Sequence, residues 1–232
     1  MFRAAPNAGP KPLGTAYAGS VPSPLHVFDS SLRARVDAHL AGFEPRCLAD
    51  ARPELRPAAV ALVITADTDG RACFLITRRP GTLRRHAGQW ALPGGRLDEG
   101  ETAIQAALRE THEEVGLSLS EENVLGRLDD FPTRSGFRMT PIVCWSEPGQ
   151  TLRPNPEEVE RLHVVPLDEL EKPGVPVLRE IPESDRPVLS IPMLGTLIHS
   201  PTAAVLYQMR EVVLNGRDTR VAHYEQPLFA WK

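Results

Sequence analysis

Hydrophobic and polar positions along the chain separate into strand-like runs and helix-like patterns. Nearly continuous apolar runs predict buried strands over residues 58–66, 72–79 and 139–147. Asp69-Gly70, between the first two runs, favours a hairpin turn. Strands of this kind, flanked by helices, predict an α/β fold with a mixed β-sheet covered by helices.

Apolar residues recurring every three or four positions predict helices in several segments. The segments with this spacing are 30–43, behind a Ser N-cap, 103–115, 166–172, and 202–216, which ends on a glycine. The Pro-rich residues 172–192 predict an irregular or edge-strand excursion instead. Residues 1–28, rich in Pro, Gly and Ala, predict a flexible arm, followed by a helical extension over 29–54 and the main domain over 55–232.

The helix over 103–115 presents two different faces. Thr102 with Gln105 fits a capping box, and Gly116 fits the C-terminal glycine. The predicted core face consists of Ile104, Ala107, Leu108, Thr111 and Val115. The other face carries Glu110, Glu113 and Glu114 near the helix C-terminus, where they repel one another and oppose the helix dipole.

A divalent cation is the natural compensation for these three glutamates, because Mg²⁺ takes oxygen ligands and bridges carboxylates to phosphates. Arg109 can hold a carboxylate in place, and Glu101 can supply a further oxygen or orient a water. Gly94 and Gly95 allow a close backbone approach, so that a carbonyl reaches the same ion. The alternative is an ordinary solvated acidic face.

The full spacing favours the metal hypothesis. Gly95, Glu101, Arg109-Glu110, Glu113-Glu114 and Gly116-Leu117 together resemble the Nudix box, with Thr111 where that box has a bulky aliphatic residue. The resemblance implies an α/β/α sandwich with a mixed sheet and an enzyme that hydrolyses a substituted diphosphate. It further implies Mg²⁺ or Mn²⁺ bound by the Gly95 carbonyl, Glu110, Glu113 and Glu114, with Glu101 and Arg109 in the catalytic machinery.

The stretch upstream of the box resembles the coenzyme A pyrophosphatase branch of that family. The matching positions in residues 75–95 are Thr77, Arg79, Arg84, Gly88, Pro93, Gly94 and Gly95, whereas Pro80 and Leu92 depart from the branch pattern. Segments 133–143, 155–170 and 201–209 also resemble that branch, so the resemblance covers about residues 55–215. It implies hydrolysis of coenzyme A or acyl-CoA to 3′,5′-ADP and 4′-phosphopantetheine or its acyl derivative.

Arg79 and Arg84 are the candidate substrate-binding residues, because guanidinium groups suit phosphate oxygens. Strand alternation predicts that Arg78 and Arg79 point to opposite faces, so that at most one of them reaches the site. A solvated basic loop is the alternative. The general base stays open between Glu113, Glu114 and Glu158.

Two other functions compete with this one. The same chemistry could act on ADP-ribose, NADH, a nucleotide sugar or another nucleoside diphosphate derivative, or the chain could be a non-catalytic Nudix-fold binding or regulatory protein. The intact set of glutamates weighs against the second. No pattern fixes the oligomeric state, and a homodimer is left open.

Composition and charge bear on three questions, namely binding to nucleic acid, insertion into a membrane and cellular location. The net charge of -4 excludes a global basic field for nucleic acid, and the longest apolar runs are too short to span a bilayer. Residues 1–25 lack the apolar segment of a secretory signal, so a cytoplasmic location is expected. Cys47, Cys73 and Cys144 show neither zinc nor disulfide spacing and are expected to pack in the core.

Overall fold

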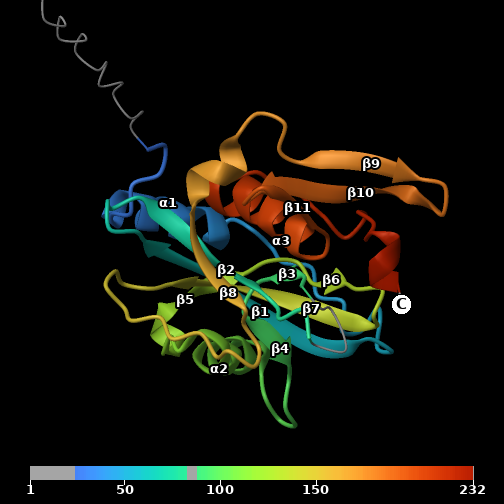
Figure 1. The fold of residues 1–232 in the computed structure, drawn as a ribbon, viewed down its shortest axis with the longest axis horizontal. Helices are drawn as coiled ribbons and strands as arrows, with labels where there is room; N and C mark the ends of the chain where they lie inside the picture. Colours follow the sequence, from blue (N-terminus) through green and yellow to red (C-terminus); the bar gives the residue numbers. More distant parts are fainter. Residues whose placement is uncertain (1–23, 83–87, 232) are drawn as a thin grey trace, which may run out of the picture.

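The computed structural model describes residues 24–82 and 88–231. Their main feature is an eight-stranded mixed sheet with the path β3-β2-β1-β7-β5, in which β4 pairs with β1, β6 with β7 and β8 with β2 (Figure 1). Its strands are β1 (Arg56–Ala66), β2 (Ala72–Arg78), β3 (Trp90–Ala91), β4 (Gly94–Arg96), β5 (Val124–Arg127), β6 (Phe131–Pro132), β7 (Phe137–Trp145) and β8 (Arg161–Pro166). β1 and β7 run parallel and the other pairs antiparallel, which confirms the mixed sheet.

Both faces of this sheet are buried, because alternate side chains of β1 enter two different cores. Ala59, Ala61 and Val63 pack with helix α2 (Ala103–Val115) on one face. On the other face, Val60, Leu62 and Ile64 pack in a cluster that includes helices α1 (Ser30–Ala41) and α3 (Thr202–Gln208). The layers are therefore helix, sheet and helix, as expected for an α/β/α sandwich.

Helix α1 is part of the larger core. Its buried residues Leu32, Val36 and Leu40 belong to the same cluster as α3. The predicted Ser N-cap is wrong, because the side chain of Asp29 accepts the hydrogen bond from the Leu32 N–H at 2.8 Å. Serine and aspartate serve equally well at this position, so sequence alone does not choose between neighbours.

The excursion predicted over 172–192 is instead a regular antiparallel sheet of three strands. It consists of β9 (Val177–Ile181), β10 (Ser184–Met193) and β11 (Thr196–His199), in the order β11-β10-β9. Leu189 and Ile191 of β10 are buried in the same cluster as α3. Pro187 of β10 lies at the register shift between Ser184 and Val188, and Pro192 lies beyond the last β10 residue that pairs with β9. Figure 1 shows this second sheet standing over α3 and above the central sheet.

The remaining predicted helices are shorter or less regular than expected. Residues 166–172 form a 3₁₀ helix, η2 (Leu167–Glu171), and α3 continues into a π-helical segment, η3 (Met209–Leu214). The chain then turns at Gly216, with φ of +65°, and ends in a 3₁₀ turn, η4 (Leu228–Trp231). A further 3₁₀ turn, η1 (Glu121–Asn123), precedes β5.

Cysteine placement departs from expectation at one position. Cys73 and Cys144 are buried, but Cys47 is exposed and so does not pack in the core. Within the described parts of the chain, no helix has both the length and the apolar character that a membrane span requires. The cytoplasmic location stays a prediction.

Candidate active site

Helix α2 begins and ends where its caps predict. The Thr102 hydroxyl accepts from the Gln105 N–H at 3.2 Å, and the Gln105 side-chain carbonyl accepts from the Thr102 N–H at 2.9 Å. Gly116 adopts the left-handed conformation, φ +69°, and its N–H donates to the His112 carbonyl at 2.9 Å. These contacts satisfy backbone groups that the helix itself leaves open at both ends.

The core face of α2 is confirmed for Ala107, Thr111 and Val115, which are buried, whereas Ile104 and Leu108 are only partly buried. The Thr111 hydroxyl donates to the Ala107 carbonyl at 2.7 Å, so this buried polar group is satisfied within the helix. Glu114, on the other face, is also buried, with 4% of its surface exposed. A solvated acidic face is therefore excluded for this glutamate.

Arg109 is the centre of an ion-pair network on α2. Its Nε and Nη2 donate to the two carboxylate oxygens of Glu101 at 2.9 and 3.0 Å. Its Nη1 donates to Glu110 at 2.9 Å and to Glu113 at 3.0 Å, and Nη2 also reaches the Arg96 carbonyl at 3.0 Å. One guanidinium thus fixes three carboxylates, and its hydrogen bonds lower the pKa of Glu101.

Glu114 lies deeper than this network. Its carboxylate accepts from the Gly94 N–H at 3.3 Å and lies 3.6 Å from Arg79 Nη1. Burial raises the pKa of Glu114 to about 8, against the opposing effects of Arg79 and the Gly94 N–H. The carboxylates of Glu110 and Glu158 add smaller contributions to the rise. Burial likewise raises the pKa of Glu110. The site therefore holds negative groups with less cationic support than they need.

Two glycines bring backbone against these carboxylates. A Cβ on Gly95 would lie 2.1 Å from the Glu110 carboxylate, and one on Gly94 would lie 2.3 Å from the Ala59 carbonyl oxygen of β1. Only glycine fits at position 94, where the nearest atoms include backbone, whereas a side chain at position 95 would displace the Glu110 carboxylate. Strand β4 is thereby pressed against both α2 and β1.

The donor set fits a divalent hard cation. The Glu110 carboxylate lies beside Gly95, and the Glu114 carboxylate, one helical turn further along, accepts from the Gly94 N–H. Among the described residues no group of three His, Cys, Asp or Glu side chains is placed so that it could hold a metal ion. The Glu110 and Glu113 carboxylates instead accept hydrogen bonds from Arg109.

Glu158 is brought to the same site from a distant part of the sequence. The loop before β8 is tied to the end of α2 by hydrogen bonds from Arg153 N–H to the Val115 carbonyl and from Asn155 N–H to the Glu114 carbonyl, at 2.7 and 2.8 Å. Glu158 follows in a turn closed on Asn155 and is close enough to Glu110 and Glu114 to raise the pKa of both.

The two adjacent arginines make different contacts but both line the cavity described below, so the prediction that at most one of them reaches the site is wrong. Strand β2 ends at Arg78, and alternation therefore does not extend to Arg79. Arg79 reaches Glu114, and its Nε is buried with no hydrogen-bond partner in the described parts of the chain. Arg78 instead donates to the Gly88 carbonyl at 3.4 Å and lies 3.8 Å from Glu160. Arg84 lies outside the described residues.

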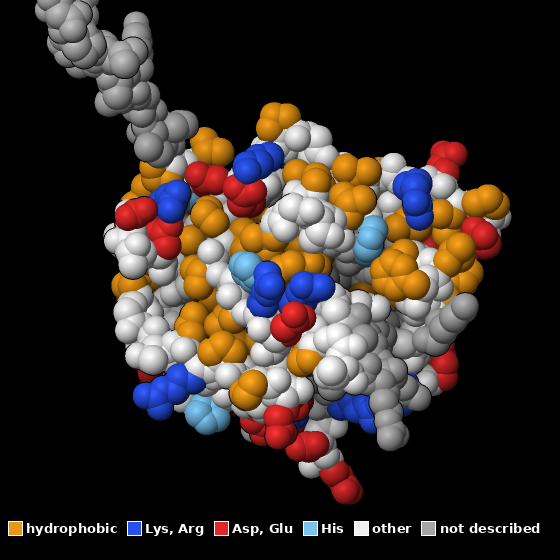
Figure 2. Space-filling model, viewed as in Figure 1, with side chains coloured by type: hydrophobic (Ala, Val, Ile, Leu, Met, Phe, Trp, Pro, Cys, Tyr) orange, Lys and Arg blue, Asp and Glu red, His pale blue; other side chains and the backbone are white. Residues whose placement is uncertain are grey.

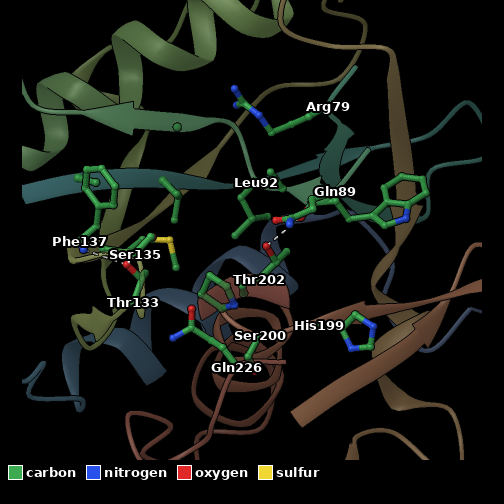
Figure 3. A pocket seen from close by; sticks show the side chains of 18 of the residues that line it. Arg79, Gln89, Leu92, Thr133, Ser135, Phe137, His199, Ser200, Thr202 and Gln226 are labelled. Carbon is green, nitrogen blue, oxygen red and sulfur yellow. Dashed lines mark hydrogen bonds between the residues drawn. The ribbon is translucent and has the colours of Figure 1, made fainter. Parts of the chain in front are cut away.

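A cavity of about 1420 Å³ opens beside Gly94, Gly95 and Arg79, between the central sheet and the C-terminal elements (Figure 3). Its described lining includes six arginines and no aspartate or glutamate. The arginines are Arg56, Arg78, Arg79, Arg96, Arg134 and Arg161. In a chain of net charge -4, this is a strongly cationic hollow. Basic side chains and a histidine gather at the centre of the face shown in Figure 2, over β2 and β8.

Comparison with known proteins identifies a family whose domain includes the glutamate helix. The model of the NUDIX domain matches residues 55–184, more than half of the chain and all of the glutamate helix. The chain belongs to the Nudix family. Nudix enzymes in general use divalent metal ions, which is the ion class that the carboxylates fit.

Its relatives include two curated Nudix hydrolases. NudL of Photorhabdus laumondii, itself uncharacterized, is 44% identical over 115 residues, covering 49% of this chain and 60% of NudL. Nudix hydrolase 3 of Caenorhabditis elegans is 36% identical over 132 residues, covering 55% of this chain and 54% of the relative. The match thus spans little more than half the length of these proteins. The solved Nudix hydrolase RenU from M. smegmatis aligns over 68% of this chain and 86% of its own, with 24% identity and a TM-score of 0.45.

The Nudix residues predicted from the sequence lie together. Those gathered on β4, α2 and the segment between them are Gly95, Glu101, Arg109, Glu110, Glu113 and Glu114, with Glu158 and Arg79 beside them. Their catalytic, metal-binding and substrate-binding roles stay predictions. The sequence did not reveal the cavity arginines Arg56, Arg96, Arg134 and Arg161, because they lie on separate elements that meet only in the fold.

Proposed function

We propose that this Nudix chain hydrolyses the diphosphate bond of coenzyme A or acyl-CoA, with Mg²⁺ or Mn²⁺, to 3′,5′-ADP and 4′-phosphopantetheine or its acyl derivative. The observation that carries the proposal is the cavity beside the glutamate helix, whose charged described lining is entirely arginine apart from histidine. Coenzyme A carries a diphosphate and a separate 3′-phosphate, so it needs cations at two places. Guanidinium groups bind phosphate oxygens through paired hydrogen bonds.

We assign the diphosphate to the end of the cavity at Arg79. Arg79 already faces Glu114, and its buried Nε has no hydrogen-bond partner in the described chain. A buried donor without an acceptor is costly, and a phosphate oxygen would satisfy it. Gly94 and Gly95 line the same end, so the scissile bond would lie next to the carboxylates.

We assign the 3′-phosphate and the adenine to the part of the cavity that β2, β3 and β8 line. Arg78 of β2 lies opposite Arg161 of β8 and Trp90 of β3 in the sheet register. His163 shares the Arg161 face of β8, lies 5.2 Å from the Trp90 ring, and has a buried Nε2 without a partner among the described residues. Two cations beside an indole ring and an open imidazole suit a phosphorylated nucleoside.

The metal would be held by Glu110, Glu113, Glu114 and the Gly95 carbonyl. Once bound, it would neutralise phosphate charge and lower the pKa of an attacking water. Arg109 orients Glu110 and Glu113, and Glu101 orients Arg109 through two hydrogen bonds. The proton of the water would pass to Glu113, Glu114 or Glu158, and the choice among these three stays open.

The reaction consumes one water. The water oxygen forms a bond to one phosphorus of the diphosphate, and the bridging P–O bond breaks with its electron pair going to the leaving phosphate. Arg79 would balance the charge that develops on the phosphate oxygens.

The test is hydrolysis of CoA with Mg²⁺ or Mn²⁺, with products identified by mass, beside dephospho-CoA and ADP-ribose. We expect 3′,5′-ADP and 4′-phosphopantetheine from CoA and loss of activity in Glu114→Gln. Arg161→Gln should lower the preference for CoA over dephospho-CoA about tenfold, the effect of losing one charge-assisted hydrogen bond. Arg186→Gln is the matched control, since Arg186 is exposed and absent from the described cavity lining.

Other outcomes would redirect the proposal. Cleavage of ADP-ribose in preference to CoA would keep the glutamate chemistry and overturn the substrate. No cleavage of any diphosphate by folded, metal-loaded protein would favour a non-catalytic Nudix-fold binding protein.

A further inference from the structure

Two of the six cavity arginines lie over one aromatic ring. The guanidinium carbon of Arg56, at the start of β1, is 4.1 Å from the centre of the Phe137 ring, and that of Arg96, at the end of β4, is 5.3 Å from it. All three residues line the cavity. Two positive charges beside one ring repel each other, and an anion bound between them would relieve that repulsion.

Strand register explains why these side chains meet. Arg56 of β1 lies opposite Phe137 of β7, and Ala58 of β1 lies opposite Arg96 of β4. Residues opposite each other on adjacent strands point to the same face of a sheet, as do residues two apart on one strand. Arg56, Phe137 and Arg96 therefore share the face of Val60, which packs on the α3 side of the sheet.

The charges of Arg56 and Arg96 are not compensated within the described chain. Neither guanidinium has a carboxylate within ion-pair distance among the described residues, and Arg56 Nη2 donates only to the neutral carbonyl of Ser135, at 2.9 Å. Three other cavity arginines each pair with a glutamate, namely Arg78, Arg79 and Arg134. This part of the cavity thus offers two positive charges to a ligand.

The loop between β6 and β7 adds a hydroxyl donor at the same place. Thr133 Oγ1 accepts from the Phe137 N–H at 2.9 Å and lies 3.1 Å from Ser135 Oγ. Only one of the two hydroxyl hydrogens can lie between these oxygens, so the other has no acceptor among the described residues. Both residues line the cavity, and Figure 3 shows them beside Phe137, on the side away from His199.

This set of donors matches a phosphate monoester. Such a group carries about 1.5 to 2 negative charges at pH 7 and presents three acceptor oxygens. A phosphate diester or a carboxylate carries one charge and would leave one guanidinium without compensation. Guanidinium groups bind phosphate oxygens through paired hydrogen bonds, and the free hydroxyl can donate to a further oxygen.

We infer that Arg56, Arg96 and the Thr133–Ser135 hydroxyl pair form a binding site for a phosphate monoester, separate from the places assigned above to the three phosphates of CoA. The identity of the occupant rests on the proposed function. Cleavage turns the diphosphate into two monoesters, and Arg96 directly follows Gly95 at the carboxylate end of the cavity. The site therefore takes the new monoester of 4′-phosphopantetheine, so that this product is retained and inhibits the enzyme.

An arginine over an aromatic ring is not by itself an anion site, and the chain provides a matched control for this. Arg33 lies 5.4 Å from the centre of the Trp145 ring, but it pairs with Asp37 and is absent from the described cavity lining. Arg33→Gln thus removes a guanidinium of the same kind without touching the proposed site.

Isothermal titration calorimetry of the metal-free protein tests the site directly. The titrants are 4′-phosphopantetheine, inorganic phosphate and uncharged pantetheine, with 3′,5′-ADP in excess to occupy the other phosphate places. We expect Arg56→Gln and Arg96→Gln each to weaken binding of 4′-phosphopantetheine by about tenfold or more, the effect of losing charge-assisted hydrogen bonds. Arg33→Gln should bind as wild type does, and pantetheine should bind at least about tenfold more weakly than its phosphate. Thermal unfolding checks that each variant is folded.

Inhibition of CoA hydrolysis by added 4′-phosphopantetheine is the second measurement. The inhibition constant should rise about tenfold in Arg56→Gln and Arg96→Gln. At low product, kcat/KM for CoA should change by less than about threefold, because the site does not hold a substrate phosphate. A purely structural role for these arginines would not raise the inhibition constant selectively.

The outcomes separate this inference from the proposed function. Equal binding of 4′-phosphopantetheine by wild type and both cavity variants would overturn the site. A fall in kcat/KM as large as the rise in the inhibition constant would overturn its separation from the substrate phosphates. Weaker binding of inorganic phosphate alone would overturn the product as occupant. Monoester binding that depends on Arg56 and Arg96, in protein that cleaves no CoA, would support the site and overturn the proposed function.

Discussion

At the scale of single residues, the site depends on glycines and carboxylates that are placed at a cost to stability. Glu114 is 4% exposed yet has only Arg79 and the Gly94 N–H as support for its charge. Gly95 leaves the space that the Glu110 carboxylate occupies. Burial of Glu114 lowers the stability of the fold wherever that carboxylate is ionised, and under the proposed function both features serve the cation site.

Gly95→Ala should abolish hydrolysis or lower kcat by more than tenfold. The added methyl group would lie 2.1 Å from the Glu110 carboxylate, so either that side chain or strand β4 must move. Steady-state kinetics and Mn²⁺ binding are the measurements. Gly42→Ala is the control, because its Cβ would meet its nearest described neighbours at an ordinary 3.7 Å. Full activity in Gly95→Ala would contradict the role given to this close approach.

Glu114→Gln should stabilise the metal-free protein at alkaline pH while removing activity. Burial raises the pKa of Glu114 from the ordinary 4.5 to about 8. Between these values the folded protein keeps a proton that the unfolded chain has released, so stability falls as pH rises through this window. The variant lacks this fall and should be more stable by about 2 kcal/mol above about pH 8.

Denaturant unfolding in the presence of a chelator, at a series of pH values, measures this effect. Glu183→Gln is the control, since Glu183 is an exposed glutamate in the turn between β9 and β10. A Glu114→Gln variant with the same pH profile as wild type would show that Glu114 is not buried as described.

At the scale of elements, helix α2 was the most predictable part of the protein. Its bounds follow from Thr102, Gln105 and Gly116, which form hydrogen bonds with the unpaired backbone groups at the two ends of the helix. Residues 172–192 were not predictable in the same way. Their strands pair with one another and pack on α3, and Val188 of β10 also bridges to Glu225, so their order depends on contacts that no local pattern contains.

Thr102→Ala should lower the free energy of unfolding by about 1 kcal/mol, because it removes the acceptor for the Gln105 N–H. Chemical denaturation followed by circular dichroism measures the loss. Thr151→Ala is the control, as Thr151 is an exposed threonine outside helices and strands. Equal stability of the two variants would mean that the cap contributes nothing to the fold.

At the scale of the whole molecule, Glu225 connects three distant segments. Its carboxylate accepts from both ends of the Arg134 guanidinium, in the loop before β7, and from the Ser184 hydroxyl at the start of β10. The next residue, Gln226, donates its own N–H to Glu225 at 2.8 Å. This single buried carboxylate therefore fastens the second sheet and the C-terminal segment to the central sheet, and these parts together line the cavity.

Glu225→Gln should remove part of the acid sensitivity of the fold. Burial alone would raise the pKa of Glu225, but the hydrogen bonds from Arg134, Gln226 and Ser184 outweigh it and lower the pKa to about 2. The resulting stabilisation, about 2 kcal/mol, is present above the ordinary value of 4.5 and is lost as pH falls toward 2.

Unfolding free energies between about pH 6 and pH 3 test this prediction. Wild type should lose more stability than Glu225→Gln as pH falls, and Asp185→Asn, at an exposed neighbouring carboxylate, should follow wild type. Parallel curves for wild type and Glu225→Gln would contradict the prediction.

The sequence by itself determined the glutamate helix, the mixed sheet and the family, because capping, strand runs and box spacing are written in neighbouring residues. Only the tertiary structure decided the burial of Glu114, the approach of Glu158, and the cavity that six arginines line. These features join residues that are far apart in the chain, and their chemistry depends on desolvation and charge proximity. Both properties arise only when the elements pack.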